Sequence, residues 1–389
     1  MAELVLVCEC GNRMPIQSEN LGTVGRCTLC GRKLQATPAN TEASDAPAAT
    51  VPTAQKAGAL APPPVDRVLS MDQLRGYAIF GMILVNYLGC FTWPPHWFEH
   101  QRGSYSYADT IAPLFIFVVG MGFRLSFLKR LERSSLTETR ISSIKRYLLL
   151  FLVGITFYGP AARIDWWDAL VEIALGGLLA LPFINQRTPV RIAAAIFYLA
   201  LFTFFYFGTG YGVWLENRSM NGGPLGPLPS AFILLFGTIG YDLLASGDRG
   251  RIFKWSLIWA VLLIVAAFVC WQLLPKEALT KPELGTQWTF AKRWSLPPFA
   301  CLSTGIAFLT FLFFYWLNDL RRIEIPTLTV LGMNPLVIYV LQYSLLAIND
   351  GYMPEDSGAL PSLLGLAVFY FVCFAVAWRL WRDKLFLRL

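Results

Sequence analysis

Charged residues are scarce in this sequence of 389 residues. Only 15% of the residues are charged and 55% are hydrophobic, whereas soluble domains carry about 25% charged residues. A polytopic membrane protein is therefore favoured over a soluble domain. The sequence also lacks a basic-aromatic tract of the kind that binds nucleic acid, and the net charge of +7 is typical of the cytoplasmic loops of a membrane protein. We expect membrane lipid, and no nucleic acid, as a partner.

A cleavable signal peptide is also not predicted. The chain begins MAELVLVC, which has no basic segment and only a short apolar run.

From about residue 70, apolar runs alternate with short polar loops. Most runs approach the roughly 20 residues that cross a bilayer as a helix. The predicted fold class is an all-α polytopic bundle of about ten transmembrane helices. They are placed near residues 74–92, 109–128, 146–161, 168–185, 192–214, 229–246, 255–274, 298–317, 326–348 and 361–380. No internal repeat is evident, which weakens a transporter built from inverted repeats.

Lysine and arginine are distributed unequally between the two sets of loops. One set, together with the C-terminal tail, carries 17 of these residues and the other set carries 7. The positive-inside rule then predicts an integral inner-membrane protein with both termini in the cytoplasm. The loop at residues 93–108 would lie on the opposite side.

Four of the eight cysteines lie within the first 30 residues. Cys8 and Cys10 form one pair, Cys27 and Cys30 form a second, and each pair is followed by glycine. Four thiolates from two tight turns suit a tetrahedral structural Zn²⁺. A disulfide pair is the alternative, although the cytoplasm is reducing. We expect a small zinc ribbon with four cysteine ligands.

Three domains are predicted from these patterns. Residues 1–35 form the cytoplasmic ribbon, and residues 36–66, which are rich in Ala, Pro and Thr, form a disordered linker. Residues 67–389 form the membrane domain.

Histidine is the rarest titratable residue here. His96 and His100 both lie in the loop between the first two apolar segments, flanked by Asn86 and Asp109. Because imidazole titrates closest to physiological pH, a carboxylate and an amide beside it would suit a general base. An interfacial histidine and a helix-capping aspartate form the alternative. His96, next to two prolines, is interpreted as an interfacial residue.

Other polar side chains lie in or near the apolar segments. Placing a polar group in a membrane costs free energy, so each of them requires a structural or functional explanation. Arg75 and Arg124 lie near the predicted cytoplasmic face, where they could meet phosphates, although Arg75 could instead pair with Asp72. Asn334 precedes a proline that would break a helix. Asp168 and Glu172, four residues apart, either bind a cationic substrate or form a solvated hairpin.

The chain resembles the heparan-α-glucosaminide N-acetyltransferases and their bacterial relatives over roughly residues 68–389. The resemblance is specific in the first two apolar segments and looser beyond them. It is carried by SMDQLRG at 70–76, VNY at 85–87, His100, AD at 108–109, PLFIFVVG at 113–120 and GMNPLVIY at 332–339.

This resemblance implies a membrane acyltransferase that moves an acetyl group from cytoplasmic acetyl-CoA to an extracytoplasmic amino sugar or glycan. It implies catalytic roles for His100, Asp109 and Asn86, with His100 as general base or acyl carrier. We place the acyl-CoA donor near Arg75, Arg124 and Asn334. A homodimer is left open.

Two family patterns are altered in this sequence. The loop from His100 to Asp109 is one residue shorter than the family's H-A-x-W-N-G-L-T-x-A-D pattern and lacks Trp-Asn-Gly. The family's L-Q-R-I is replaced by LVEI at 170–173. Two other functions therefore stay open: a non-catalytic transporter or flippase on the same fold, and a cytoplasmic docking module formed by the ribbon.

Overall fold

The computed structural model describes residues 3–7, 13–17, 22–26, 33–37, 41–43, 68–100, 103–158, 166–219, 221–274 and 289–386. The chain divides into two compact units, Met1–Val65 and Asp66–Leu389.

The N-terminal unit consists of short antiparallel strands. One sheet has the order β2-β1-β5 and a second pairs β3 with β4. The strands are β1 (Glu3–Val7), β2 (Arg13–Gln17), β3 (Val24–Arg26), β4 (Lys33–Gln35) and β5 (Thr41–Ala43). Because β5 pairs with β1, the structured unit extends past residue 35 into the segment expected to be a linker.

Each predicted cysteine pair falls between two strands that pair with each other. Cys8 and Cys10 separate β1 from β2, and Cys27 and Cys30 separate β3 from β4. All four cysteines lie outside the described residues, so the metal site stays a prediction. Among the residues that the structure describes, no cluster of His, Cys, Asp and Glu could hold a metal ion.

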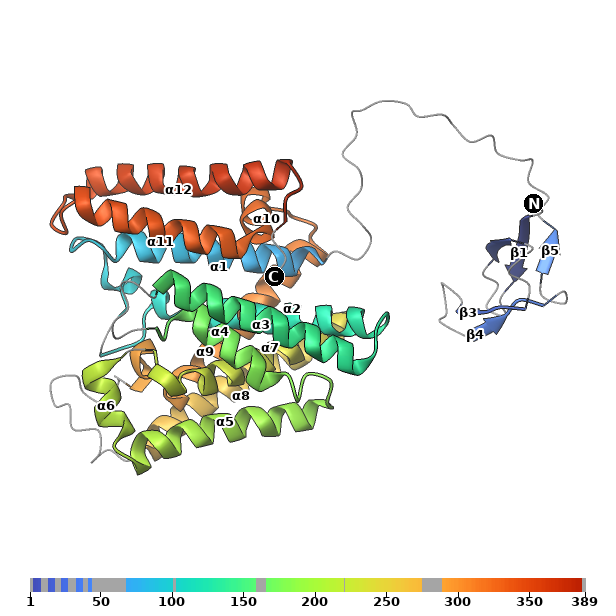
Figure 1. The fold of residues 1–389 in the computed structure, drawn as a ribbon, viewed down its shortest axis with the longest axis horizontal. Helices are drawn as coiled ribbons and strands as arrows, with labels where there is room; N and C mark the ends of the chain where they lie inside the picture. Colours follow the sequence, from blue (N-terminus) through green and yellow to red (C-terminus); the bar gives the residue numbers. More distant parts are fainter. Residues whose placement is uncertain are drawn as a thin grey trace. The chain divides into compact units, whose positions relative to one another are not determined.

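The second unit is all-helical within its described residues, as predicted (Figure 1). Helices α1, α11 and α12 lie side by side, and α7 packs against α2, α4, α5, α8 and α9. The helices are α1 (Leu69–Leu88), α2 (Tyr107–Leu131), α3 (Leu136–Tyr158), α4 (Ala169–Ala180), α5 (Thr188–Gly208), α6 (Tyr211–Arg218), α7 (Pro227–Ala245), α8 (Arg249–Leu273), α9 (Pro297–Phe314), α10 (Pro326–Met333), α11 (Pro335–Tyr352) and α12 (Ala359–Arg382).

Six helices of the described chain are long and apolar enough to cross a membrane, compared with the ten predicted spans. They are α2, α5, α7, α8, α9 and α12, with α7 counted from Gly223 and α9 extended to Leu320. A seventh span is obtained if α10 and α11 are counted as one, although they meet at 90°. Helix α4, with 12 residues, is too short to span as a straight helix.

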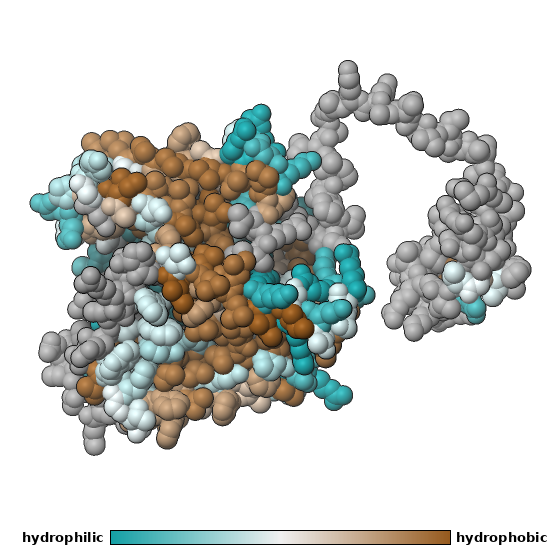
Figure 2. All heavy atoms as spheres, in the orientation of Figure 1, coloured by the Kyte–Doolittle hydropathy of each residue, from teal (hydrophilic) through white to brown (hydrophobic). Residues whose placement is uncertain are grey.

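The outer helix faces are apolar, as a lipid environment requires. On α8, Leu257, Val261 and Val265 are all about half exposed, and on α12, Val368 and Phe371 are more than 60% exposed. Figure 2 shows hydrophobic residues gathered along the helices and hydrophilic residues toward their ends. Such exposed apolar surface is unfavourable in water, so these faces support an integral membrane protein.

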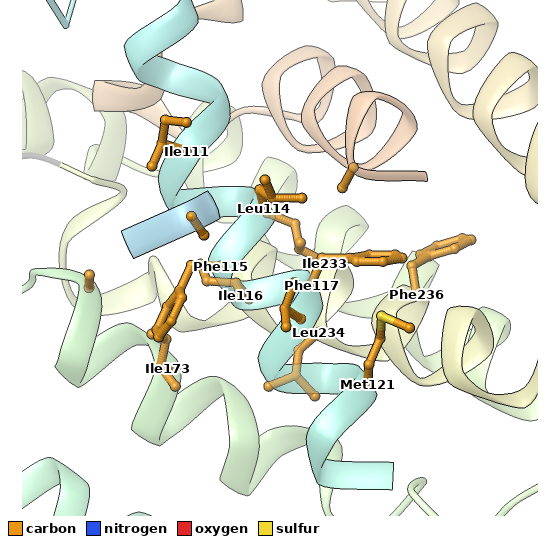
Figure 3. Packing of buried hydrophobic residues seen from close by; sticks show 14 of the residues in the cluster. Ile111, Leu114, Phe115, Ile116, Phe117, Met121, Ile173, Ile233, Leu234 and Phe236 are labelled. Atoms are coloured by element: carbon orange, nitrogen blue, oxygen red, sulfur yellow. The ribbon is translucent and has the colours of Figure 1, made fainter. Parts of the chain in front are cut away.

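The core of the helical unit is the contact between α2 and α7. Leu114, Phe117 and Met121 on α2 pack near Ile233 and Leu234 on α7 (Figure 3). All five side chains are at least 97% buried. This contact fixes α2, whose N-terminus carries Asp109.

Glycines allow the closest approaches in this core. A Cβ atom at Gly120 would collide with the carbonyl oxygen of Leu234, and one at Gly237 would collide with that of Phe117. Gly76 on α1 and Gly332 on α10 face each other's helices in the same way. Small residues at such crossings are typical of membrane helices.

We expect Gly120→Ala to destabilise the protein by about 1–3 kcal/mol, because the added methyl group forces α2 away from α7. Thermal unfolding in detergent measures the effect. Gly351→Ala on α11 is the matched control, since nothing lies within 4 Å of a Cβ at that position. Equal unfolding temperatures for the two variants would contradict the proposed packing role.

Candidate functional site

The loop between α1 and α2 brings His100 to the N-terminus of α2. Ser106 is the N-cap of α2, and its hydroxyl accepts a hydrogen bond from the backbone N–H of Asp109 at 3.4 Å. The Asp109 carboxylate accepts one from the backbone N–H of Ser106 at 3.1 Å. This reciprocal capping box fixes the first turn of α2.

The same carboxylate holds His100. Its Oδ1 atom lies 2.8 Å from Nδ1 of His100, while Oδ2 receives the Ser106 contacts. Asp109 is completely buried, and 44% of the His100 side chain is exposed. A carboxylate here favours the proton on Nδ1, which leaves Nε2 as the nitrogen that can accept a proton. The predicted convergence of His100 and Asp109 is therefore present.

A small pocket opens beside this pair. It is lined by residues of α1, α2, α11 and η6 (Lys292–Trp294), by the start of α4, and by His100. The lining residues are Met82, Val85, Asn86, His100, Ala108, Ile111, Ala112, Asp168, Ala169, Lys292, Tyr339 and Tyr343. Asn86, predicted from the sequence, thus shares the pocket with His100.

Three polar residues of this pocket come from distant segments. Asp168 caps α4 by accepting from the backbone N–H of Ala169 at 2.7 Å, and it accepts the hydroxyl of Tyr343 at 3.1 Å. Lys292 lies on η6, just before α9. The sequence pattern presents Asp168 only as half of an acidic pair and does not indicate a site role for Lys292 or Tyr343. Because these residues lie far from His100 in the sequence, no local sequence pattern links them to it.

The surroundings of His100 favour its neutral form. The pKa of His100 is lowered from its usual value, chiefly because protein atoms crowd the imidazole and then because Lys292 is nearby. Its Asp109 hydrogen bond and charge act in the opposite direction without cancelling the effect. The crowding by protein atoms lowers the pKa of His100 although part of its side chain is exposed to solvent. A neutral imidazole at physiological pH is what a general base requires.

Arg75 and Asn334 lie toward the other end of α1. The Nη1 atom of Arg75 is 3.5 Å from Asp72 and 3.4 Å from the carbonyl oxygen of Gly332, near the α10–α11 break. Asn334 occupies that break and donates to the carbonyl oxygen of Leu385 at 3.1 Å. Arg75 and Asn86 are 11 residues apart in α1, or about 16 Å along its axis. These groups therefore do not share the His100 pocket.

Arg124 is held by a structural ion-pair cluster. Its Nε atom is 3.0 Å from Asp242, and its Nη1 atom donates to the carbonyl oxygen of Ile184. Asp242 also pairs with Arg191, which is 99% buried. The guanidinium of Arg124 is thus engaged by the protein itself, and this geometry favours a structural role over the predicted donor contact.

Two further sequence candidates are separated from the pocket lining. His96 is 85% exposed on its side chain and lies 3.6 Å from Glu99, consistent with its interpretation as an interfacial residue. Glu172 is buried and accepts a hydrogen bond from the Ser230 hydroxyl at 3.0 Å. Asp168 lines the pocket, whereas Glu172 is not among the lining residues.

We expect Asp109→Asn to lower the pKa of His100 further, because both contributions of Asp109 raise it. At a given pH near neutrality, the variant would then hold less imidazolium than the parent protein. Nitrogen NMR of histidine-labelled protein in lipid nanodiscs measures the titration of His100, with His96 as the internal reference. An unchanged or raised pKa would contradict the proposed pairing.

We expect Asp242→Asn to destabilise the protein by about 3–5 kcal/mol, because it leaves buried Arg191 without its counter-charge. Thermal unfolding in detergent is the measurement. Asp383→Asn is the control, since the Arg379–Asp383 pair at 2.8 Å is exposed and such pairs contribute less than about 1 kcal/mol. Similar small losses in both variants would contradict the structural role of the cluster.

Known proteins resemble this chain in sequence over the segment that contains the candidate site. Residues 67–256 match the family described as "Heparan-alpha-glucosaminide N-acetyltransferase, catalytic". A protein described as an uncharacterized 39.9 kDa protein in the amylase 3′ region of Bacillus acidopullulyticus is 32% identical over 133 residues, which cover 33% of this chain and 37% of that relative. His100, Asp109 and Asn86 all fall within the family match. The family match spans 190 of the 389 residues of the chain.

Proposed function

We propose that this protein is a membrane-bound acyltransferase that moves an acetyl group from acetyl-CoA to an amino sugar or glycan. The observation that carries the proposal is the 2.8 Å contact between His100 and buried Asp109, beside a pocket that His100 lines together with Asn86. The family match over residues 67–256 supports the same class of reaction. The acyl chain and the acceptor rest on the resemblance alone.

In the proposed reaction, His100 acts as a general base. Its Nε2 atom takes a proton from the acceptor amine or hydroxyl as that group attacks the thioester carbonyl. The tetrahedral intermediate collapses, the C–S bond breaks, and the imidazolium returns the proton to the departing CoA thiolate. Asp109 orients the imidazole and stabilises its positive charge, as a carboxylate does in a catalytic triad.

A covalent route is compatible with the same residues. His100 would first attack the thioester itself and carry the acetyl group before transferring it to the acceptor. In either route, negative charge develops on the carbonyl oxygen. Asn86 lines the pocket, and its amide would stabilise this charge or hold the acyl group.

The donor would approach from the end of α1 that carries Arg75. Arg75 and Asn334 provide polar groups at the α10–α11 break. Because that end is about 16 Å from Asn86 along α1, only an extended arm of the donor would reach His100. A nucleotide at the break and a thioester at the pocket suit the elongated shape of acyl-CoA.

The charge distribution supports a reaction across the membrane. We place both termini and the α10–α11 break in the cytoplasm, and His100 on the opposite side, because lysine and arginine are concentrated in one set of loops. The acetyl donor and the acceptor would then be supplied from different compartments. An accessible cysteine label added before α1, tested from each side, measures this orientation.

We also propose a structural Zn²⁺ bound by Cys8, Cys10, Cys27 and Cys30. Each pair separates two strands that pair with each other, so a strand hairpin would present each pair. Four thiolates leave no open coordination position, which suits a structural site. No step of the transfer uses this metal.

We expect His100→Ala to reduce acetyl transfer from labelled acetyl-CoA to glucosamine by about 10²–10⁴-fold, the usual contribution of a general base. The assay uses the full-length protein in proteoliposomes. His96→Ala, the other histidine of the same loop, is the matched control and should retain activity.

Transfer at the parental rate by His100→Ala would overturn the catalytic assignment. Uptake of a sugar by the proteoliposomes without consumption of acetyl-CoA would instead support the transporter alternative. A labelled acetyl group trapped on His100 in the absence of acceptor would select the covalent route.

A further inference from the structure

One cation in the His100 pocket has no place in the mechanism described above. Lys292 is half-buried and lines the pocket with His100, Asn86 and Asp168. It lies 36 residues beyond the end of the segment that matches the family. Its role is therefore a question about this chain rather than about the matched segment.

The backbone around Lys292 is fixed by several contacts. The carbonyl oxygen of Arg293 accepts a hydrogen bond from the N–H of Gly222 at 3.1 Å, and the neighbouring Trp294 is 98% buried. The N–H of Ser295 donates to the carbonyl oxygen of Lys292 at 3.1 Å, which closes the turn. The ammonium group therefore projects from a turn anchored in the helical unit.

The nearest acid in the pocket lining is already engaged by other donors. Asp168 accepts from the backbone N–H of Ala169, from the Tyr343 hydroxyl at 3.1 Å and from the Asn221 amide at 3.3 Å. None of the ion pairs formed within the described part of the chain includes Lys292. The charge of Lys292 is thus not neutralised by a contact ion pair there.

We propose that Lys292 is a positioning residue whose fixed positive charge keeps His100 unprotonated in the resting site. The ammonium group and the imidazole line one small pocket, where protonation of the imidazole would place two positive charges close together. Like charges at such short range repel each other. Asp109 holds the ring in place, and Lys292 opposes its premature protonation.

This role has a consequence in each half of the transfer, which rests on the proposed function. In the first half, a neutral imidazole is available to take the acceptor proton. In the second half, repulsion by Lys292 makes the imidazolium a stronger acid, so the proton moves more readily to the departing thiolate. One fixed charge would thereby favour both proton transfers.

The charges that face His100 act in both directions. Desolvation and Lys292 lower its pKa, while Asp109 on α2 and Asp168 before α4 raise it. Tyr339 and Tyr343 of α11 also line the pocket, and on the same loop Glu99 lies beside His96. Because Lys292 lowers the pKa of His100, its removal should raise that pKa.

The test is a histidine titration of the full-length protein in nanodiscs, followed by nitrogen NMR. The chain has two histidines, which His96→Gln assigns. We expect Lys292→Met to raise the titration midpoint of His100 and leave that of His96 in place. Lys292→Arg keeps the charge and should retain the parental midpoint. An unmoved His100 midpoint in Lys292→Met would overturn the proposal.

Arg293→Met is the matched control for loss of a charge from the same turn. The Arg293 guanidinium stacks on Trp294 and donates to the carbonyl oxygen of Glu216 at 3.4 Å, so it is engaged elsewhere. We expect no change in the His100 midpoint for this variant. An equal rise in Arg293→Met and Lys292→Met would overturn the specific role of Lys292.

The pH dependence of kcat/KM provides the second readout. A base works only when neutral, so raising the His100 pKa should move the acid limb of the Lys292→Met profile to higher pH. An acid limb that stays in place would contradict the role of Lys292 in the transfer. Absence of acetyl transfer by the parent protein would refute the proposed function. The histidine titration would still test whether Lys292 opposes protonation of His100.

Discussion

The architecture of the candidate site depends on one buried carboxylate, that of Asp109. One oxygen lies 2.8 Å from Nδ1 of His100, and the other accepts from Ser106 in the capping box of α2. The cap satisfies backbone donors that the helix itself cannot satisfy. The histidine contact selects the ring nitrogen that carries the proton. Loss of this carboxylate would therefore disturb the start of a core helix and the orientation of the base together.

This local arrangement needs a rigid frame, which the helix crossings provide. Helix α2 is locked to α7 through Gly120 and Gly237, and α1 is locked to α10 through Gly76 and Gly332. Because backbone meets backbone at these crossings, no flexible side chain can absorb a shift between the helices. Asn86 on α1 and Asp109 on α2 are consequently held beside a common pocket. Loops alone would not hold an amide, a carboxylate and an imidazole at fixed positions relative to one another.

The sequence was informative where the site is local and silent where it is assembled from distant segments. His100 and Asp109 are nine residues apart, so the short loop between the first two apolar segments predicts that they converge. The pairing of Arg124 with Asp242 joins residues 118 positions apart, and no periodicity indicates such a partner. Lys292 and Tyr343 reach the pocket only through the packing of η6 and α11.

The Asn334-Pro335 pair predicted a break in the helix, but only the structure gives its 90° bend. The ten-span prediction counted apolar runs, whereas α4 has 12 helical residues.

Fixed charges of opposite sign act on the same imidazole, and this opposition has a functional logic. Asp109 alone would orient His100 but would also favour its protonated form, which cannot act as a base. Lys292 alone would favour the neutral form but would leave the ring without a hydrogen bond to orient it. With both present, the hydrogen bond supplies orientation while crowding and Lys292 keep the pKa of His100 below its usual value. Orientation and basicity are thus set by different residues on different elements, α2 and η6. Substitutions on η6 would then adjust the basicity of His100 without disturbing the cap that positions it.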